Sequence, residues 1–237
     1  MENQEEKISF KQILWYFIIF SIIGLIIETI FCYVTTGVIE SRKGLIWGPF
    51  CPVYGVGATL LIILLNPYKN KPIKLLILGS ILGNVIEYLL SFVLEAYYGT
   101  RFWDYSYLKW NLNGRICILY SIYWGILSFV LIRFVKKGMD KLIHKIPNSK
   151  LFHIIIIIAL IIDGVATIWA ITSYQDRIGI EYYHKEVKTN QSTFQIIKSK
   201  IEETLFSDEM MVKTFPNLRY TDQTGNQDFI KSKIKAN

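Results

Sequence analysis

The chain has 237 residues, of which 52% are hydrophobic and only 19% charged, and its mean hydropathy is +0.33. Lys and Arg number 26 against 19 Asp and Glu, so the formal net charge is +7. The apolar residues form long, almost uncharged runs. This excludes a water-soluble domain, because too little other chain remains to cover them. The composition therefore predicts a polytopic integral membrane protein.

Five segments are long enough to cross the hydrocarbon core of a bilayer, which needs roughly 20 apolar residues in a helix. They lie at about residues 13–36, 47–65, 73–98, 116–135 and 151–173. The second segment opens with Pro49 and Pro52, which disfavour regular helix there. Irregular backbone is tolerated inside a membrane only where protein or water covers its polar groups. We expect an all-α, polytopic membrane helical bundle of about five transmembrane helices.

The predicted transmembrane domain spans residues 13–173, between an N-terminal leader at 1–12 and a soluble helical tail at 174–237. No small-residue cleavage site follows the first apolar run, so we expect this helix to be retained. Eleven Lys and Arg lie in loops on the N-terminal side of the membrane and five in the opposite loops. This bias predicts a cytoplasmic N-terminus, and five spans then place the tail outside.

The tail is expected to contain one amphipathic helix. Ser192 and Gln195 form a capping-box pattern at its start. The apolar positions that recur at helical spacing are Phe194, Ile197, Ile201 and Leu205. Their shared face needs a partner, which is either the membrane domain, the alternative that we favour, or the membrane surface.

An internal repeat is predicted in the membrane domain. Residues 21–32 and 80–91 align without a gap and share Ser, Ile, Gly, Ile and Glu at equivalent positions. Apolar sequences align easily by chance, but the shared glutamate weakens that explanation, because a charge in mid-membrane costs about 2.5–3.5 kcal/mol. We expect two related hairpins, at about 13–66 and 73–135, arranged as a parallel repeat.

Three acids lie inside predicted membrane helices: Glu28, Glu87 and Asp163. Gly24 and Gly83 each lie one turn before a glutamate and share its helix face. Small residues let neighbouring helices approach closely, and acids on the same face then point into the bundle. The acids either join the helices through hydrogen bonds or line a polar intramembrane cavity, and their number favours the cavity.

A second polar group follows the third span, in a loop on the same side of the membrane as the first loop. It begins with Glu95, near the end of that span, and continues in the loop with Arg101, Trp103, Asp104 and Arg115. A guanidinium binds carboxylate or phosphate bidentately, so the arginines suit either these acids or an anionic ligand. The tryptophan fits an interfacial aromatic belt equally well. We predict that both polar groups bind ligand or line the cavity.

Several chemical signatures are missing from the sequence. No Walker-type phosphate loop occurs, so the chain cannot itself power transport with ATP. The histidines, His144, His153 and His184, are scattered and do not resemble a metal or haem site. Basic residues follow the membrane loops, which argues against a nucleic-acid partner. We expect no catalytic residue, metal or cofactor, and enzyme activity is less favoured than binding or transport.

Four separated motifs carry a resemblance over nearly the whole chain. They are Gly48-Pro49-Phe50-Cys51-Pro52-Val53-Tyr54-Gly55, Trp103-Asp104-Tyr105-Ser106, Asn111-Leu112-Asn113-Gly114-Arg115-Ile116-Cys117 and Phe215-Pro216-Asn217-Leu218-Arg219. Together they resemble a bacterial family of ABC-transporter type IV permeases, also called CmpB-like. The resemblance implies a multi-pass protein of the bacterial cell membrane. The motif and repeat positions to which we assign structural roles are Gly24, Gly83, Pro49, Pro52, Tyr54, Gly55, Asn113 and Gly114.

Two functions are consistent with these patterns. The first is an ABC transporter permease that recognises a small or lipid-like ligand and is driven by a separate ATP-binding subunit. That subunit would dock on the basic segment from Arg133 to Lys150, and a homo-oligomer would complete the transport pathway. The second is an ATPase-independent membrane protein, either an ion-coupled transporter or a lipid head-group enzyme or binder, that uses the buried acids.

Overall fold

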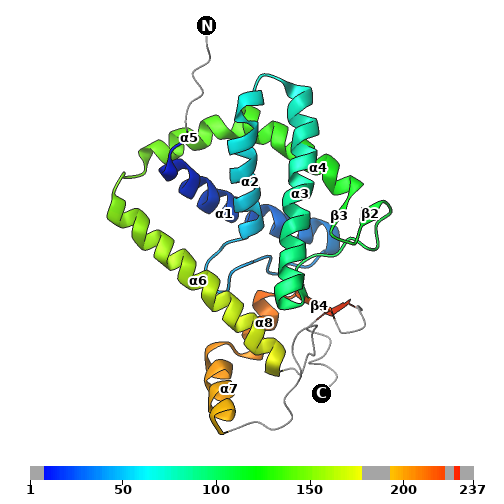
Figure 1. Cartoon of the computed structure of the whole chain (residues 1–237), viewed down its shortest axis with the longest axis vertical. Coiled ribbons are helices and arrows are strands. Elements are labelled where there is room, and N and C mark those ends of the chain that lie inside the picture. The colour runs from blue at the N-terminus through cyan, green and yellow to red at the C-terminus, as the bar shows by residue number, and fades with distance from the viewer. Residues whose placement is uncertain (1–7, 178–192, 222–226, 230–237) are drawn as a thin grey trace. The chain divides into compact units, whose positions relative to one another are not determined.

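The computed structural model describes residues 8–177, 193–221 and 227–229. Its elements in chain order (Figure 1) are α1 (Phe10–Thr36), α2 (Pro52–Leu65), η1 (Asn66–Tyr68), α3 (Pro72–Tyr98), β1 (Thr100–Arg101), β2 (Asn111–Leu112), β3 (Ile116–Cys117), α4 (Ile118–Val130), η2 (Leu131–Val135), α5 (Lys136–Lys145), α6 (Lys150–Arg177), α7 (Thr193–Leu205), α8 (Asp208–Thr214), β4 (Arg219–Thr221) and β5 (Gln227–Phe229). Of the predicted capping box, Ser192 lies outside the described residues.

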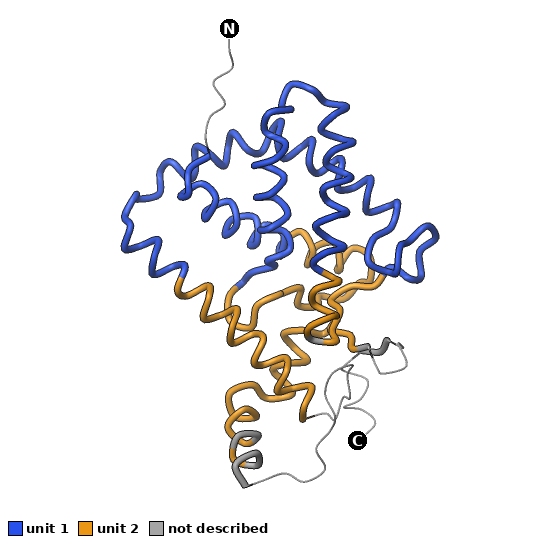
Figure 2. The backbone as a smooth tube through the Cα atoms, viewed as in Figure 1, with its two compact units in different colours: residues 1–26, 49–90, 105–157 blue, residues 27–48, 91–104, 158–237 orange. Residues whose placement is uncertain are grey.

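The chain divides into two compact units (Figure 2). The first unit comprises residues 1–26, 49–90 and 105–157, and the second comprises 27–48, 91–104 and 158–237. Helices α1, α3 and α6 each contribute residues to both units. Each unit has its own buried cluster of side chains.

Four helical stretches are long and apolar enough to cross a membrane: Phe10–Thr36, Pro72–Tyr97, Ile118–Lys145 and Lys150–Arg177. A shorter apolar stretch, Pro52–Tyr68, combines α2 and η1. Large apolar side chains on these helices remain exposed, as expected of residues that face lipid rather than water. The prediction of an all-α membrane helical bundle is confirmed.

Helix α2 begins five residues later than the predicted span, at Pro52 instead of Trp47. Proline suits the first turn of a helix, because the N–H that it lacks would have no partner within the helix. The preceding residues, 47–51, have no helical structure. This agrees with the irregular start expected from the two prolines.

The segment from Arg133 to Lys150, expected to be a loop, is largely helical. Helix α4 continues through the π-helical turn η2 into α5 and ends at Lys145 (Figure 1). Residues 133–145 contain no proline and are rich in good helix formers, so the helix continues through them. The helix ends where Ile146, the residue before Pro147, adopts extended backbone angles.

In the first unit, α1 and α2 approach closely at glycines. A Cβ atom added at Gly24 would overlap the side chain of Tyr54, and one added at Gly55 would overlap Ser21 Oγ. The buried cluster near these contacts includes Tyr16. Glycine is therefore needed at both positions because the helices are too close to admit a side chain.

Helices α3 and α4 make the same contacts at the aligned positions. A Cβ atom at Gly83 would overlap the side chain of Trp124, and one at Gly125 would approach Ser80 Oγ closely. Gly83 corresponds to Gly24 in the alignment of residues 21–32 with 80–91, and Gly125 corresponds to Gly55 when residues 44–55 are aligned with 114–125. The parallel repeat stays a prediction, and these matched contacts support it.

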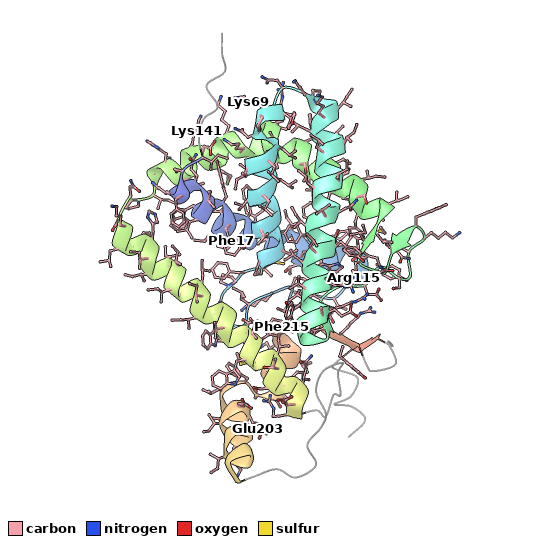
Figure 3. All side chains as sticks on the ribbon, viewed as in Figure 1. Phe17, Lys69, Arg115, Lys141, Glu203 and Phe215 are labelled. Carbon is pink, nitrogen blue, oxygen red and sulfur yellow. The ribbon has the colours of Figure 1, made fainter. Side chains whose placement is uncertain are left out.

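The second unit joins the tail to the loop after α3. Strand β1 pairs with β4 in antiparallel register, Thr100 opposite Tyr220 and Arg101 opposite Arg219, and β4 pairs with β5. The tail was expected to be helical, and its strands β4 and β5 were not predicted because three residues each are too few to show a local strand pattern. The buried cluster of this unit, which includes Phe215 (Figure 3), draws on α6, α8 and the residues before β4.

Helix α7 confirms the predicted helix in the tail, but the described part of its apolar face does not pack on the membrane domain, the favoured alternative, so contact with the membrane surface stays a prediction; the side chain of Phe194 lies outside what the structure describes. Ile197, Ile201 and Leu205 are 54%, 52% and 50% exposed. Instead, Glu202 is buried, and its Oε1 accepts a hydrogen bond of 2.7 Å from Trp169 Nε1 on α6. The indole N–H offers a polar partner that the helical periodicity does not reveal.

The glycine contact between α3 and α4 can be tested by substitution. Gly83→Ala is expected to lower the unfolding free energy by about 1–3 kcal/mol, because the new methyl group would displace the Trp124 side chain. The matched control is Gly164→Ala on α6, where nothing lies within 4 Å of an added Cβ. Thermal unfolding of both variants in detergent is the measurement, and equal midpoints would contradict the packing.

Candidate functional site

A buried polar group of the first unit centres on Glu87. This residue lies on α3 and is 6% exposed. Its Oε1 accepts a hydrogen bond of 2.8 Å from the Tyr105 hydroxyl, and its Oε2 accepts one of 2.9 Å from Trp124 Nε1. The donors come from the loop after α3 and from α4. The carboxyl group is thus held in place from two segments that are distant in sequence.

Neighbouring contacts hold these donors in place. The ring of Tyr105 stacks on that of Tyr120, with centroids 4.4 Å apart and planes at 15°. One turn before Trp124 on α4, Ser121 Oγ donates a 2.9 Å hydrogen bond to Asn84 Oδ1 on α3. Offset stacking and interhelical hydrogen bonds both restrict side-chain rotation. We refer below to Glu87, Tyr105 and Trp124 as the Glu87 cluster.

Arg115 lies beside the C-terminal half of α3 (Figure 3) and is 7% exposed. Its guanidinium carbon is 5.6 Å from the centroid of the Tyr88 ring, a cation–π distance. Asn113 Nδ2 donates a 2.9 Å hydrogen bond to the hydroxyl of the same tyrosine. The sequence analysis predicted that Arg115 binds an acid or an anionic ligand, whereas the contact with Tyr88 is one with an aromatic ring.

The turn between β2 and β3 accounts for the motif around Asn113 and Gly114. Their φ angles are +54° and +66°, in the left-handed region that asparagine and glycine tolerate best. Asn111 Oδ1 accepts a 3.0 Å hydrogen bond from the Gly114 N–H, and the Gly114 carbonyl accepts one of 2.7 Å from the Tyr105 N–H. The turn therefore positions the backbone of a residue in the Glu87 cluster, which supports the structural role assigned to the motif.

In the second unit, two of the predicted acids pair with arginines. Glu95 Oε2 lies 2.5 Å from Arg101, and both side chains are largely buried. Asp104 Oδ2 lies 2.9 Å from Arg219, 115 residues away in the sequence. Arg219 was not predicted as a site residue. The one sequence feature that could have indicated it is the tail motif at residues 215–219, of which Arg219 is the last residue.

Asp163 on α6 is 5% exposed and accepts hydrogen bonds from the backbone. Its Oδ1 accepts one of 3.1 Å from the Trp47 N–H, and its Oδ2 one of 2.9 Å from the Gly48 N–H. One turn later, Thr167 Oγ1 accepts a 2.9 Å hydrogen bond from the Ile46 N–H. These side chains cover the polar groups of the irregular backbone that precedes α2, as a bilayer requires.

The remaining predicted residues are Glu28 and Trp103. Both belong to the second unit and are half-buried. The repeat pairs Glu28 with Glu87, which belongs to the first unit. Because the two glutamates belong to different units, a role for Glu28 in ligand binding stays a prediction.

The contacts of Asp163 predict a large effect on stability. Asp163→Ala would leave two backbone N–H groups without their acceptor, at a cost of about 1–3 kcal/mol each. Asp163→Asn keeps one acceptor oxygen and is expected to lose less. Thermal unfolding in detergent would rank the wild type, the Asn variant and the Ala variant in that order. An Ala variant as stable as the wild type would contradict the assignment.

Comparison with known proteins identifies one family. The family described as "Putative ABC-transporter type IV" matches residues 15–168, well over half of the chain. No curated protein and no solved structure matches. The matched region includes the Glu87 cluster, Arg115 and Asp163, and it confirms the family predicted from the motifs. The chain is a multi-pass membrane protein and belongs to the ABC-transporter type IV family.

Proposed function

We propose that the chain is the membrane permease of a transporter and that it recognises a small or lipid-like ligand at the Glu87 cluster. Family membership supports an ABC-transporter-related role. The observation that carries the site is the buried carboxyl group of Glu87, held by Tyr105 and Trp124. An ionisable residue inside a membrane helix is costly to bury and commonly marks a substrate or ion pathway.

The chemistry of the cluster suggests what it would bind. A carboxylate accepts hydrogen bonds and attracts cations, and the faces of Tyr and Trp rings attract cations as well. A ligand with an amine or another donor group therefore suits this position. Arg115 lies within cation–π distance of the ring of Tyr88, the residue that follows Glu87. In the proposal, Arg115 binds an anionic group of the same ligand. A polar cavity that joins these groups remains part of the proposal.

The other predicted acids have structural contacts that lower their priority as ligand-binding residues. Glu95 and Asp104 pair with arginines, and Asp163 binds backbone N–H groups. Each contact secures a loop or the start of a helix. In the proposal, Glu87 contacts the ligand, whereas these residues, together with Arg101, Trp103 and Glu28, belong to the second unit and have no assigned contact with it.

Energy for transport would come from a separate ATP-binding subunit, because the sequence has no Walker-type loop. Its proposed docking surface is the exposed surface of α5, which includes Lys137 and Leu142. The Lys and Arg bias predicts that this face lies in the cytoplasm of the cell. A second copy of the chain, packed through small-residue faces, would complete the transport pathway.

Purification of the full chain in mild detergent tests this proposal. We expect an ATP-binding subunit to co-purify, and Lys137→Glu combined with Leu142→Glu to reduce its recovery at least fivefold. Both residues are exposed, so the fold should be unaffected. The matched control is Glu203→Lys on the exposed side of α7. Absence of any ATP-binding protein from the wild-type preparation would contradict the ABC mechanism.

Once the complex is isolated, Glu87→Gln tests the site itself. Glutamine keeps the size of the side chain but removes the charge, and we expect the ATPase activity of the reconstituted complex to change by at least tenfold. Glu203→Gln, an exposed acid in the tail, is the control. Wild-type ATPase activity in the Glu87 variant would contradict ligand recognition at this cluster.

A buried carboxyl group also favours an ATPase-independent alternative, in which Glu87 carries a proton or binds an ion. Proteoliposomes that contain only this chain and a pH-sensitive dye would reveal such activity. Proton movement without ATP that disappears in Glu87→Gln would support the alternative over the ABC mechanism. Lack of proton movement would contradict proton coupling.

A further inference from the structure

A pocket separate from the Glu87 cluster lies in the first unit, between the start of α1 and α5. Its volume is about 660 Å³. Its lining residues include Gln12, Lys136, Asp140, Lys141, His144 and Lys145. A space of this size accommodates a small organic group. Nothing in the proposed transport function accounts for it.

The base of the pocket is built and braced. Asp140 accepts hydrogen bonds from the Tyr16 hydroxyl, from Gln12 Nε2 at 3.4 Å and from Lys136 Nζ at 2.7 Å. Tyr16 is fully buried and Lys136 is 8% exposed. At the other end of α5, Lys11 Nζ donates a hydrogen bond of 2.5 Å to the Ile146 carbonyl. These contacts fasten α5 to the start of α1.

Because Asp140 neutralises Lys136, the positive charge of the pocket comes from Lys141 and Lys145. Both side chains are exposed, and within the part of the chain that the structure describes neither forms a hydrogen bond or ion pair. His144 lies between them in sequence and also lines the pocket. Two ammonium groups beside an imidazole form a site for an anion with several oxygen atoms, such as a phosphate ester.

The position of the pocket favours a lipid as the source of that phosphate. The pocket lies where α1 begins and the apolar stretch Ile118–Lys145 ends, and lipid headgroups surround the ends of helices that cross a bilayer. An exposed apolar side chain adjoins it in sequence: Phe10, which is 66% exposed, lies between the lining residues Ile8 and Gln12. Basic pockets between membrane helices are suited to anionic headgroups, while apolar side chains nearby contact the acyl chains. We propose that this pocket binds the phosphate headgroup of an anionic lipid.

Native mass spectrometry of the full chain, titrated with phosphatidylglycerol, tests this assignment. Lys141→Gln combined with Lys145→Gln is expected to weaken phosphatidylglycerol binding by roughly tenfold or more, because both ammonium groups line the pocket and would contact the phosphate directly. The control replaces Lys69 and Lys71, two exposed lysines in the turn between α2 and α3, with glutamine. Figure 3 labels Lys69 and Lys141, one from each pair.

The control pair removes the same charge, so it should leave the affinity within about twofold of the wild type. Equal losses in the two double variants would indicate nonspecific attraction to basic loops and would overturn the proposal. Equal binding of phosphatidylcholine and phosphatidylglycerol would overturn it as well.

A second arm distinguishes a lipid from a soluble phosphate ester. Glycerol 3-phosphate and inorganic phosphate, each added to lipid-bound protein at millimolar concentration, should fail to displace phosphatidylglycerol because they lack acyl chains. Displacement by either compound would overturn the lipid assignment and indicate a soluble ligand. These measurements do not involve Glu87, so their outcome is separate from that of the transport proposal.

Discussion

Polar groups inside a bilayer must find their partners within the protein, because lipid tails offer none. Asp163 shows the consequence for the backbone: its two carboxylate oxygens accept the N–H groups of Trp47 and Gly48, where the chain has no helix to satisfy them. Glu87 shows the consequence for a side chain, since its oxygens are held by Tyr105 and Trp124. The same requirement thus leads to a structural acid in one unit and a candidate ligand-binding acid in the other.

Close packing supplies the partners. Between membrane helices there is little hydrophobic driving force, so association depends on van der Waals contact and interhelical hydrogen bonds. Gly83 removes the side chain that would separate α3 from Trp124, and one turn further along α3 the indole of that tryptophan reaches Glu87. Gly24 brings Tyr54 equally close to α1. A glycine and an aromatic residue therefore act together, because the first creates the space that the second fills.

Charge is used differently at the base of α5. Asp140 binds Lys136, and this pair joins α5 to α1 through Tyr16. Lys141 and Lys145, further along α5, line the pocket beside this pair and form no ion pair with an acid among the described residues. The helix thus combines a neutralised, braced face with a cationic one. That division follows from the spacing of four residues between Lys136 and Asp140, which places them on adjacent turns of one face.

The amino-acid sequence by itself determined the membrane class, the positions of the long helices, the family and the glycines on helix faces, because hydropathy and helical periodicity are properties of neighbouring residues. It also located Glu87 and Asp163 as unusual acids. Only the tertiary structure decided what each acid does, since its partners lie far away in the chain: Asp163 is 116 residues from Trp47, and Glu87 is 37 from Trp124. The pairing of Asp104 with Arg219 and the pocket beside α5 likewise depend on segments brought together by folding, which no local pattern encodes.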